Sequence, residues 1–476
     1  MKIHRTLAAC LAAGLLGACA AEAPYDLVIA NGRVMDPESG LDAVRHVGIR
    51  GGTIQAVSET PLDGAKVIDA SGHVVAPGFI DLHEHGQQEE SYAMMVRDGV
   101  TSAFELEVGT ADVPAWYGAR EGGQIVNYGV SVGHIPARME VLGDPGPGLL
   151  PAGVGGSGTA TEAQILAMEE ILRDGLRQGA VAVGFGSAYT PGADMDEIER
   201  MFRIAGEAGA SAHIHLRSGV PGLDSTLAAA GRAGAPLHIV HVNSSAGDDL
   251  DEFLQHIQAA LDAGQDVTTE AYPYGAGMTE IQSALFDDWE SWPDERFGLH
   301  QLVSTGERLT RESFGRARGE GGTVIIHGRS EAQTRAAIAS PLSMIASDGF
   351  IENGRGHPRT SGSYAKVLGR YVRDEGVVDL MDALRRMSLE PAIRLQERTP
   401  AMASKGRIRV GADADVTVFD PATVLDRATY EDATLPSAGI PYVVVGGQVV
   451  VDRGAVTDAR PGRAVRAPVA TAAQGG

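Results

Sequence analysis

Short apolar segments alternate with amphipathic, helix-like segments through the middle of the chain, and this alternation constrains the fold most. The helix-like segments are clearest over 162–178, 196–208 and 248–263. Apolar strands separated by such helices are typical of a parallel barrel with its helices outside. The strands that we expect are 78–83, 101–107, 130–134, 180–184, 211–215, 237–241, 267–272 and 343–347. The sequence therefore predicts an α/β fold, a (β/α)8 TIM-type barrel over 78–405.

Strand signals also occur at both ends of the chain. Residues 24–77 contain short apolar runs with turns at Asn31-Gly32 and Gly51-Gly52, and 406–457 contain a strand at 414–419 and a hairpin around Gly446-Gly447. Neither segment alone is large enough for a sheet with two covered faces. We therefore expect one small β-sandwich domain built from both ends.

Two regions depart from the barrel pattern. The 70 residues over 273–342 separate the last two expected barrel strands, and we place an insertion at about 280–330. Within it, 322–328 has strand character of its own, which leaves the assignment of the last strands open. The tail over 458–476 is rich in Ala, Pro and Gly and is predicted to be disordered.

Residues 1–18 have the pattern of a bacterial lipoprotein signal peptide. Lys2 and Arg5 precede an apolar run over 7–17, too short to span a bilayer in the usual way. The run ends in Leu16-Gly17-Ala18-Cys19, which resembles the cleavage site at which the cysteine becomes the lipidated first residue. An ordinary signal peptide cut near Ala20 or Ala23 is the alternative. Ala20 after the cysteine favours the outer membrane, so we expect an envelope protein facing the periplasm.

Charge and cysteine content narrow the functional classes. The net charge is -23, which argues against a nucleic-acid partner because phosphate binding needs a basic face. We expect contact with a membrane through the lipid anchor only, and the sequence leaves the oligomeric state open. The cysteines are Cys10 and Cys19, so a mature chain would contain no free thiol and no disulfide. Any metal site must then be built from histidine and carboxylate.

Histidines stand at the ends of three predicted strands. His83 and His85 close the first strand, and residues i and i+2 of a strand share one face, so both imidazoles can point at the same ion. His215 ends the fifth strand and His241 the sixth. Active sites of such barrels lie at the C-terminal ends of the strands. We therefore predict Zn²⁺, as one or two divalent ions, at this mouth.

Several motifs resemble those of known hydrolases. Pro77-Gly78-Phe79-Ile80-Asp81-x-His83-x-His85 resembles the first-strand motif of amidohydrolases. Other motifs, spread over residues 26–455, are similar to the N-acyl-D-amino-acid deacylase (D-aminoacylase) family. These are His215-Leu216-Arg217, Tyr272-Pro273-Tyr274, Ser347-Asp348-Gly349, His357-Pro358-Arg359 and the closing Gly406-x-Ile408-x-x-Gly411-x-x-Ala414-Asp415.

The resemblance implies both roles and an activity. The four strand-end histidines match the family's metal ligands, Asp348 matches its catalytic aspartate, and Tyr189 resembles a tyrosine that polarises the scissile carbonyl. The implied reaction is metal-dependent hydrolysis of the amide bond in N-acyl amino acids or short peptides, those of D configuration included. A cyclic amidase, lactonase or deaminase is the alternative within the superfamily. A catalytically silent binding protein is a third reading, which the retained ligands and Asp348 argue against.

The chain departs from the family at its second strand. The family often places a cysteine ligand there, whereas this chain has Val108 and a mature sequence without thiols. Glu105 and Glu107 share a strand face, and two inward carboxylates are costly without a cation. We infer that a glutamate, Glu107 in preference to Glu105, replaces the sulfur ligand, with exposure of both as the alternative. A bridging carboxylated lysine is excluded, because the lysines are Lys2, Lys66, Lys366 and Lys405.

A second departure concerns the substrate. The family usually carries His-Lys after the sixth-strand histidine, and its lysine contacts the substrate carboxylate; here Val242-Asn243 stand instead. Tyr272 is retained, but six residues later, where the family has a hydroxyl-bearing residue, this chain has Met278. Arg217 and Arg359 could each grip an anion bidentately, or serve structural pairs. We expect substrates whose carboxyl end is extended, masked or replaced. His134 is interpreted as adjacent to the site, and His213, His238 and His327 as structural.

Overall fold

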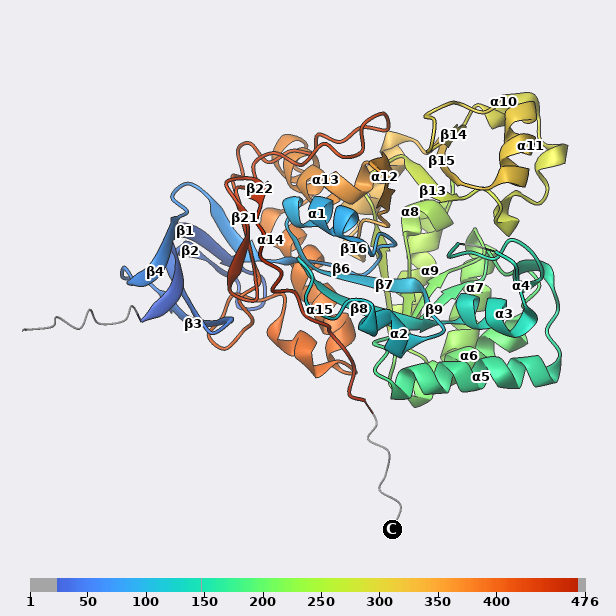
Figure 1. The fold of residues 1–476 in the computed structure, drawn as a ribbon, viewed down its shortest axis with the longest axis horizontal. Helices are drawn as coiled ribbons and strands as arrows, with labels where there is room; N and C mark the ends of the chain where they lie inside the picture. Colours follow the sequence, from blue (N-terminus) through green and yellow to red (C-terminus); the bar gives the residue numbers. More distant parts are fainter. Residues whose placement is uncertain (1–23, 147, 470–476) are drawn as a thin grey trace, which may run out of the picture.

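A computed structural model describes residues 24–146 and 148–469. Eight parallel strands lie in the order β16-β12-β11-β10-β9-β8-β7-β6, which confirms the predicted barrel. Their bounds are β6 (Phe79–Asp81), β7 (Val100–Thr110), β8 (Asn127–Gly133), β9 (Val183–Gly186), β10 (Ala212–His215), β11 (Leu237–Ile239), β12 (Val267–Ala271) and β16 (Ser343–Ile345). Figure 1 labels five of them, β6, β7, β8, β9 and β16.

The barrel is closed by the segment that follows its last strand. The Asp348 backbone N–H donates to the His83 carbonyl at 2.7 Å, and the Ser347 N–H donates to Asp81 Oδ1 at 3.1 Å. These bonds connect the ends of β6 and β16 without a regular ladder. The closure therefore places Asp348 directly beside the first-strand histidines.

Helices cover the outside of the barrel. α5 (Glu162–Arg177) begins with a capping box between Thr161 and Gln164. α6 (Met195–Glu207) is capped by Asp194, whose side chain accepts a hydrogen bond from the Glu197 N–H. The other helices are α1 (Glu89–Arg97), α2 (Val113–Gly118), α3 (His134–Leu142), α4 (Val154–Ser157), α7 (Val220–Ala233), α8 (Val242–Ser245), α9 (Leu250–Asp262), α12 (Glu331–Ala339), α13 (Arg359–Lys366), α14 (Leu380–Leu384) and α15 (Glu390–Gln396).

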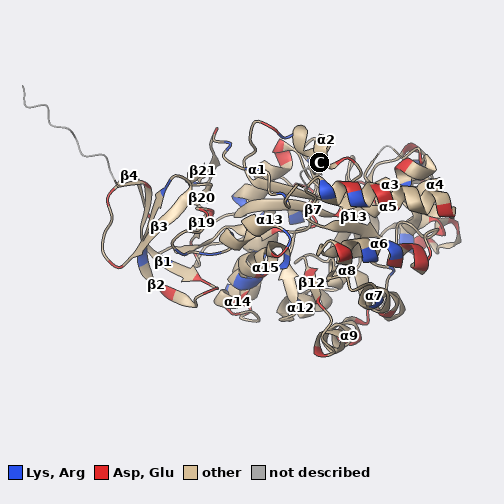
Figure 2. Cartoon of the chain, turned by 90° about the horizontal axis from the view of Figure 1, so that it is seen from below, with Lys and Arg blue, Asp and Glu red and all other residues tan. Residues whose placement is uncertain are grey.

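Acidic and basic residues are interspersed on the outer helices (Figure 2). Ion pairs link neighbouring helices: Arg200 of α6 contacts Glu162 of α5 at 2.8 Å, and Arg232 of α7 contacts Glu199 of α6 at 2.7 Å. Exposed pairs of this kind contribute about 0–1 kcal/mol each. Among the described residues, no helix is both long enough and apolar enough to cross a membrane.

Both ends of the chain build one sheet domain beside the barrel. β5 (Val74–Pro77) pairs with β1 in parallel and with β19 (Val416–Phe419) in antiparallel register, so the two ends share one hydrogen-bonded sheet. Its other strands are β1 (Tyr25–Asp36), β2 (Leu41–Arg50), β3 (Thr53–Ser58), β4 (Gly64–Asp69), β20 (Tyr442–Val445), β21 (Gln448–Asp452) and β22 (Ala455–Val456). Val47, Val75 and Val416 belong to one buried cluster within it.

The insertion between β12 and β16 is a small subdomain of its own. β13 (Ala276–Glu280) and β14 (His300–Leu302) both pair with β15 (Thr323–His327), and α10 (Asp294–Phe297) and α11 (Arg311–Glu320) complete it. It starts before the expected residue 280, because β13 is needed as the antiparallel partner of β15. Phe286, Trp292 and Phe314 are buried in its own core.

The described part of the C-terminal tail corrects our prediction of disorder. Residues up to 469 are described, and this segment lies along the barrel: Gly462 bridges to Gln124 and Ala464 to Tyr128. Val465 is buried, and its carbonyl accepts from the Tyr117 hydroxyl at 2.7 Å. Composition alone did not indicate this order, because backbone hydrogen bonds to residues far away in sequence hold the segment. Residues 470–476 lie outside the described part.

Candidate active site

A cavity of about 720 Å³ opens at the C-terminal ends of the barrel strands. The predicted site residues that line it come from seven of the barrel strands or from the segments that follow them. They are His85, Glu107, Tyr189, His215, His241, Tyr272, Met278, Asp348 and Arg359. This is the position at which barrel enzymes bind their substrates.

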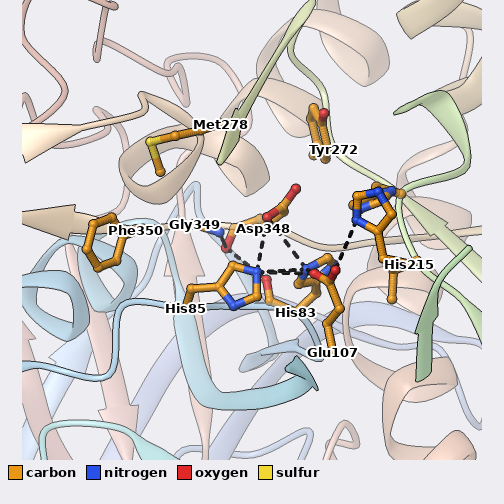
Figure 3. A network of polar contacts seen from close by, with 12 residues as sticks. His83, His85, Glu107, His215, Tyr272, Met278, Asp348, Gly349 and Phe350 are labelled. Carbon is orange, nitrogen blue, oxygen red and sulfur yellow. Dashed lines mark hydrogen bonds and ion pairs between the residues drawn. The ribbon is translucent and has the colours of Figure 1, made fainter. Parts of the chain in front are cut away.

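His83 and His85 point at the same spot, as their spacing on the first strand predicts (Figure 3). The two Nε2 atoms lie 3.2 Å apart. Asp348 Oδ1 lies 3.5 Å from His83 Nε2 and 3.4 Å from His85 Nε2. Ring nitrogens and a carboxylate oxygen thus converge on one point, as ligands of a metal ion do.

Glu107 connects this group to the histidines of the later strands. Its Oε2 lies 2.6 Å from His83 Nε2, and its Oε1 lies 3.0 Å from His215 Nδ1. His241 Nε2 in turn lies 3.1 Å from His215 Nδ1. One carboxylate therefore reaches both pairs of histidines, which is the geometry of a ligand shared between two positions.

Glu105 has a different place from Glu107. Its Oε2 lies 2.7 Å from His85 Nδ1, the ring nitrogen that faces away from the convergence point, and its Oε1 accepts from the Val108 N–H at 3.0 Å. Glu105 is fully buried and orients His85 from behind. The geometry therefore favours Glu107 over Glu105 as the ligand.

Glu270 was missed by our sequence reasoning. It lies on β12, with Oε1 2.6 Å from His83 Nδ1 and Oε2 3.0 Å from His238 Nε2. Burial raises the pKa of Glu270, but His83 and His238 outweigh burial and lower it to about 2. A polar residue in a buried strand, two positions before Tyr272, was the available signal.

Two site residues have a left-handed backbone. His241 has φ 35° and Asp348 has φ 53°, although neither is glycine. Such conformations cost about 1–3 kcal/mol each and concentrate at functional sites. His241 lies two residues after β11 and Asp348 three residues after β16, so the turn out of each strand aims the side chain into the mouth.

Asp348 pairs with Arg359 at the wall of the cavity. Arg359 Nη2 lies 2.8 Å from Asp348 Oδ1, and the arginine side chain is buried. Burial alone raises the pKa of Asp348, but Arg359 and His83 outweigh it and hold the pKa well below its usual range. Nε and Nη1 of Arg359 are buried without a protein partner. The cavity wall therefore offers a charged donor to an anion.

Tyr189 lies across the cavity against His215, with ring centroids 4.5 Å apart. Its hydroxyl accepts from Thr279 Oγ1 at 3.4 Å. Burial raises the pKa of Tyr189 well above its usual value, so the phenol keeps its proton. It is therefore available as a hydrogen-bond donor, the role suggested by the sequence.

The donor set fits a divalent cation. Two groups of ligand atoms lie within 4.8 Å of one another: His83, His85, Glu107 and Asp348 form one, and Glu107, His215 and His241 form the other. Burial, with His215 nearby, lowers the pKa of His241 to about 3, so this ring is neutral and can ligate. Imidazole and carboxylate are ligands that zinc accepts.

Some predicted site residues lie elsewhere. Arg217 does not line the cavity, and its guanidinium donates to the Ala193 carbonyl at 2.5 Å. Asn243 is buried and donates to the Tyr272 carbonyl at 3.0 Å, so it supports the wall without lining the cavity. His134, which we interpreted as adjacent to the site and expected at a strand end, begins α3, and its Nε2 lies 2.8 Å from Glu197 Oε1. Each forms local bonds that strand-end position alone does not reveal.

Histidines and carboxylates converging at the mouth of a (β/α)8 barrel define the class of metal-dependent barrel hydrolases. A family model, the amidohydrolase family, matches residues 139–451. The chain is 32% identical to an N-acyl-D-glutamate deacylase of Alcaligenes xylosoxydans xylosoxydans, over 93% of this chain and 96% of the relative. It belongs to the amidohydrolase family.

Solved structures agree with this assignment. The N-acyl-D-glutamate deacylase from Bordetella bronchiseptica, complexed with zinc and a phosphonate mimic of the tetrahedral intermediate, superposes with a TM-score of 0.80 at 28% identity, covering 93% of this chain and 100% of that one. A D-aminoacylase studied for its binuclear metal centre superposes at 0.74 and 28% identity, with the same coverage. These homologues thus bind metal within the same fold.

Proposed function

We propose that this protein is a metal-dependent amide hydrolase that acts on N-acyl amino acids or related amides and short peptides. The observation that carries the proposal is the convergence of two ligand groups on Glu107 beside Asp348, in one cavity. Relatives that hydrolyse N-acyl-D-amino acids make the D configuration the first choice.

The metal would be held by the predicted ligands, His83, His85, Glu107, His215 and His241. Bound there, a divalent cation supplies a Lewis acid and lowers the pKa of a water molecule to about 7. Glu105 and Glu270 hold the outer nitrogens of His85 and His83, so both rings keep the orientation that ligation needs.

The chain's own groups move the proton and steady the developing charge. Asp348 is ionised beside Arg359, so it can accept the proton of the attacking water and return it to the leaving amine nitrogen. Its contacts with Arg359 and both histidines use Oδ1, and we assign the proton to Oδ2. Tyr189 keeps its proton and donates a hydrogen bond from its hydroxyl to the carbonyl oxygen as negative charge develops there.

The cavity walls indicate an apolar substituent on the substrate. Leu149, Leu150, Leu285 and Phe350 line the cavity beside Met278. Burying a side chain of leucine size against such walls contributes about 1.5–3 kcal/mol. The preferred substrates should therefore carry an apolar side chain or acyl group.

The test is a substrate screen with controlled metal content. Protein freed of metal with a chelator is compared with the same protein reloaded with Zn²⁺, using N-acyl amino acids and dipeptides of both configurations. We expect amine release only after reloading. Full activity without metal, or no hydrolysis of any N-acyl compound after reloading, would contradict the proposal.

We also propose that Cys19 carries a lipid that anchors the enzyme in the outer membrane, facing the periplasm. Cys19 lies outside the described residues, so the support is the order of Lys2, Arg5, the apolar run over 7–17 and Leu16-Gly17-Ala18-Cys19. An enzyme at that site would meet acylated amino acids and peptides arriving from outside the cell.

A further inference from the structure

A second arginine approaches the cavity from the insertion. Arg329 follows β15 and precedes α12. Its Nη2 donates to Ser244 Oγ at 3.0 Å, and its Nη1 donates to the Tyr272 hydroxyl and the Tyr274 carbonyl, both at 3.2 Å. Among the described residues, Arg329 forms no ion pair with a carboxylate, so its charge is not neutralised by the protein.

The position of Arg329 is fixed by its backbone and by an aromatic ring. Its N–H donates to the Gly275 carbonyl at 3.1 Å. A Cβ on Gly275 would lie 2.8 Å from the Arg329 carbonyl oxygen, so only glycine allows this close approach. The guanidinium carbon lies 5.3 Å from the centroid of the Tyr272 ring, within cation–π range.

The arginine determines how two hydroxyls of the cavity wall are oriented. Ser244 and Tyr272 both line the cavity, and each oxygen accepts a hydrogen bond from Arg329. Each hydroxyl therefore keeps its own proton for another acceptor. Gly277 leaves the tyrosine hydroxyl open, since a Cβ there would come within 3.3 Å of it. Two O–H donors backed by one positive charge match the needs of a carboxylate.

These hydroxyls lie next to the candidate metal ligands. The Ser244 N–H donates to the His241 carbonyl at 2.7 Å, and the Tyr272 ring lies 6.3 Å from the His241 ring. Arg359, which pairs with Asp348, lies 4.6 Å from the same tyrosine ring. In an N-acyl amino acid the carboxylate carbon is two bonds from the scissile nitrogen, so a carboxylate site must be this close to the reacting atoms.

We propose that Ser244 and Tyr272, positioned and polarised by Arg329, form the subsite for the α-carboxylate of the substrate. The inference rests on the proposed function and adds that the substrate's carboxylate is free. Asn243 and Met278 led the sequence analysis to expect a masked or extended carboxyl end. Arg329 supplies positive charge from another element, which local motifs around Asn243 do not reveal.

The test compares paired substrates in Arg329 variants. kcat and KM are measured with Zn²⁺-loaded enzyme for N-acetyl-D-leucine, N-acetyl-D-methionine and N-acetyl-D-phenylalanine, and for the C-terminal amide of each. Arg329→Met should lower kcat/KM for the acids about 10–100-fold, mainly through KM, and change it less than about threefold for the amides. Arg329→Lys should recover much of the loss, and Ser244→Ala and Tyr272→Phe should shift the preference in the same direction.

A matched control removes a different arginine. Arg217→Met deletes a guanidinium that donates to the Thr190 and Ala193 carbonyls outside the cavity, and it should leave the ratio of acid to amide unchanged. Equal losses for acids and amides in Arg329→Met would overturn the subsite, and so would a wild-type preference for the amides.

Calorimetric binding separates this inference from the proposed function. The acids and amides are titrated into Zn²⁺-loaded Asp348→Asn protein, whose turnover is slow. If this protein binds the acids more tightly than the amides, and the added Arg329→Met substitution abolishes that preference, the subsite is supported. This holds even if the wild-type protein hydrolyses neither the acids nor the amides. Hydrolysis without such a preference refutes the subsite alone.

Discussion

The Glu270 carboxylate holds His83 from behind, with Oε1 2.6 Å from the Nδ1 of the ring. The opposite nitrogen, Nε2, then lies 2.6 Å from Glu107 Oε2. With its pKa lowered to about 2, Glu270 is ionised at neutral pH. A carboxylate on one ring nitrogen fixes the tautomer and makes the other nitrogen a better metal ligand.

Glu270→Gln should weaken zinc binding about 10–100-fold while leaving the fold intact, because the amide lacks the charge that holds His83. Zinc retained after dialysis against graded chelator, measured by elemental analysis, checks this. Thr268→Val is the matched control, since the Thr268 hydroxyl contacts the far nitrogen of His238 at 2.8 Å and the Leu237 carbonyl at 3.5 Å, and its loss leaves the contact between Glu270 and His83 in place. Unchanged zinc affinity in Glu270→Gln would show that the pair serves the core and not the metal site.

Glu107 and Glu105 should respond differently to the same substitution. Glu107→Gln removes the carboxylate shared by both ligand groups and should abolish stoichiometric zinc binding. Glu105→Gln should keep the stoichiometry and lose about 10–100-fold in affinity, because it only orients His85. Glu107→Cys should retain metal, since thiolate is a zinc ligand. A larger zinc loss in Glu105→Gln than in Glu107→Gln would reverse the assignment.

The sequence predicted those parts of the site that depend on local spacing. His83 and His85 share a face because strands have a period of two, and His215 and His241 end strands whose rhythm defines the barrel. The barrel itself is likewise a repeat of local patterns, and the structure confirms it.

Contacts between distant elements could not be predicted in the same way. Glu270 reaches His83 from β12 on the opposite side of the strand order, and Arg329 returns to Ser244 only because β13 pairs with β15. Our prediction of a disordered tail was wrong for a related reason, because the order of its described part comes from backbone bridges to Gln124 and Tyr128. A single sequence gives residue types but not which loops meet.

Asp348→Asn should keep the fold and the zinc content while lowering kcat about 10²–10⁴-fold, the usual contribution of a general acid–base group. The amide can keep its place near Arg359 but cannot accept the proton. Steady-state rates are measured together with melting temperature and zinc content. Turnover close to that of the wild type would show that Asp348 is only a turn residue.

Cys19→Ala should release the enzyme from the membrane fraction or block its processing. The kinetics of the purified protein should not change, because the catalytic cavity is built from residues 85–359. Fractionation with immunodetection, and labelling with a fatty-acid analogue, check the anchor. Native protein found entirely in the soluble cytoplasmic fraction would contradict it.

Tyr189→Phe should lower kcat about 10²–10³-fold with little change in zinc content, as expected when one donor to a developing oxyanion is removed. The phenol donates only while it keeps its proton, and burial raises its pKa well above the usual value. The ring should remain against His215, since their contact does not use the hydroxyl. Thr279→Val is the matched control: it removes the hydrogen bond to the Tyr189 oxygen but keeps the phenol, so its effect on kcat should be much smaller. A Tyr189→Phe variant with kcat within about threefold of the wild type would remove this residue from the mechanism. An equal loss in both variants would assign the effect to the shape of the cavity wall.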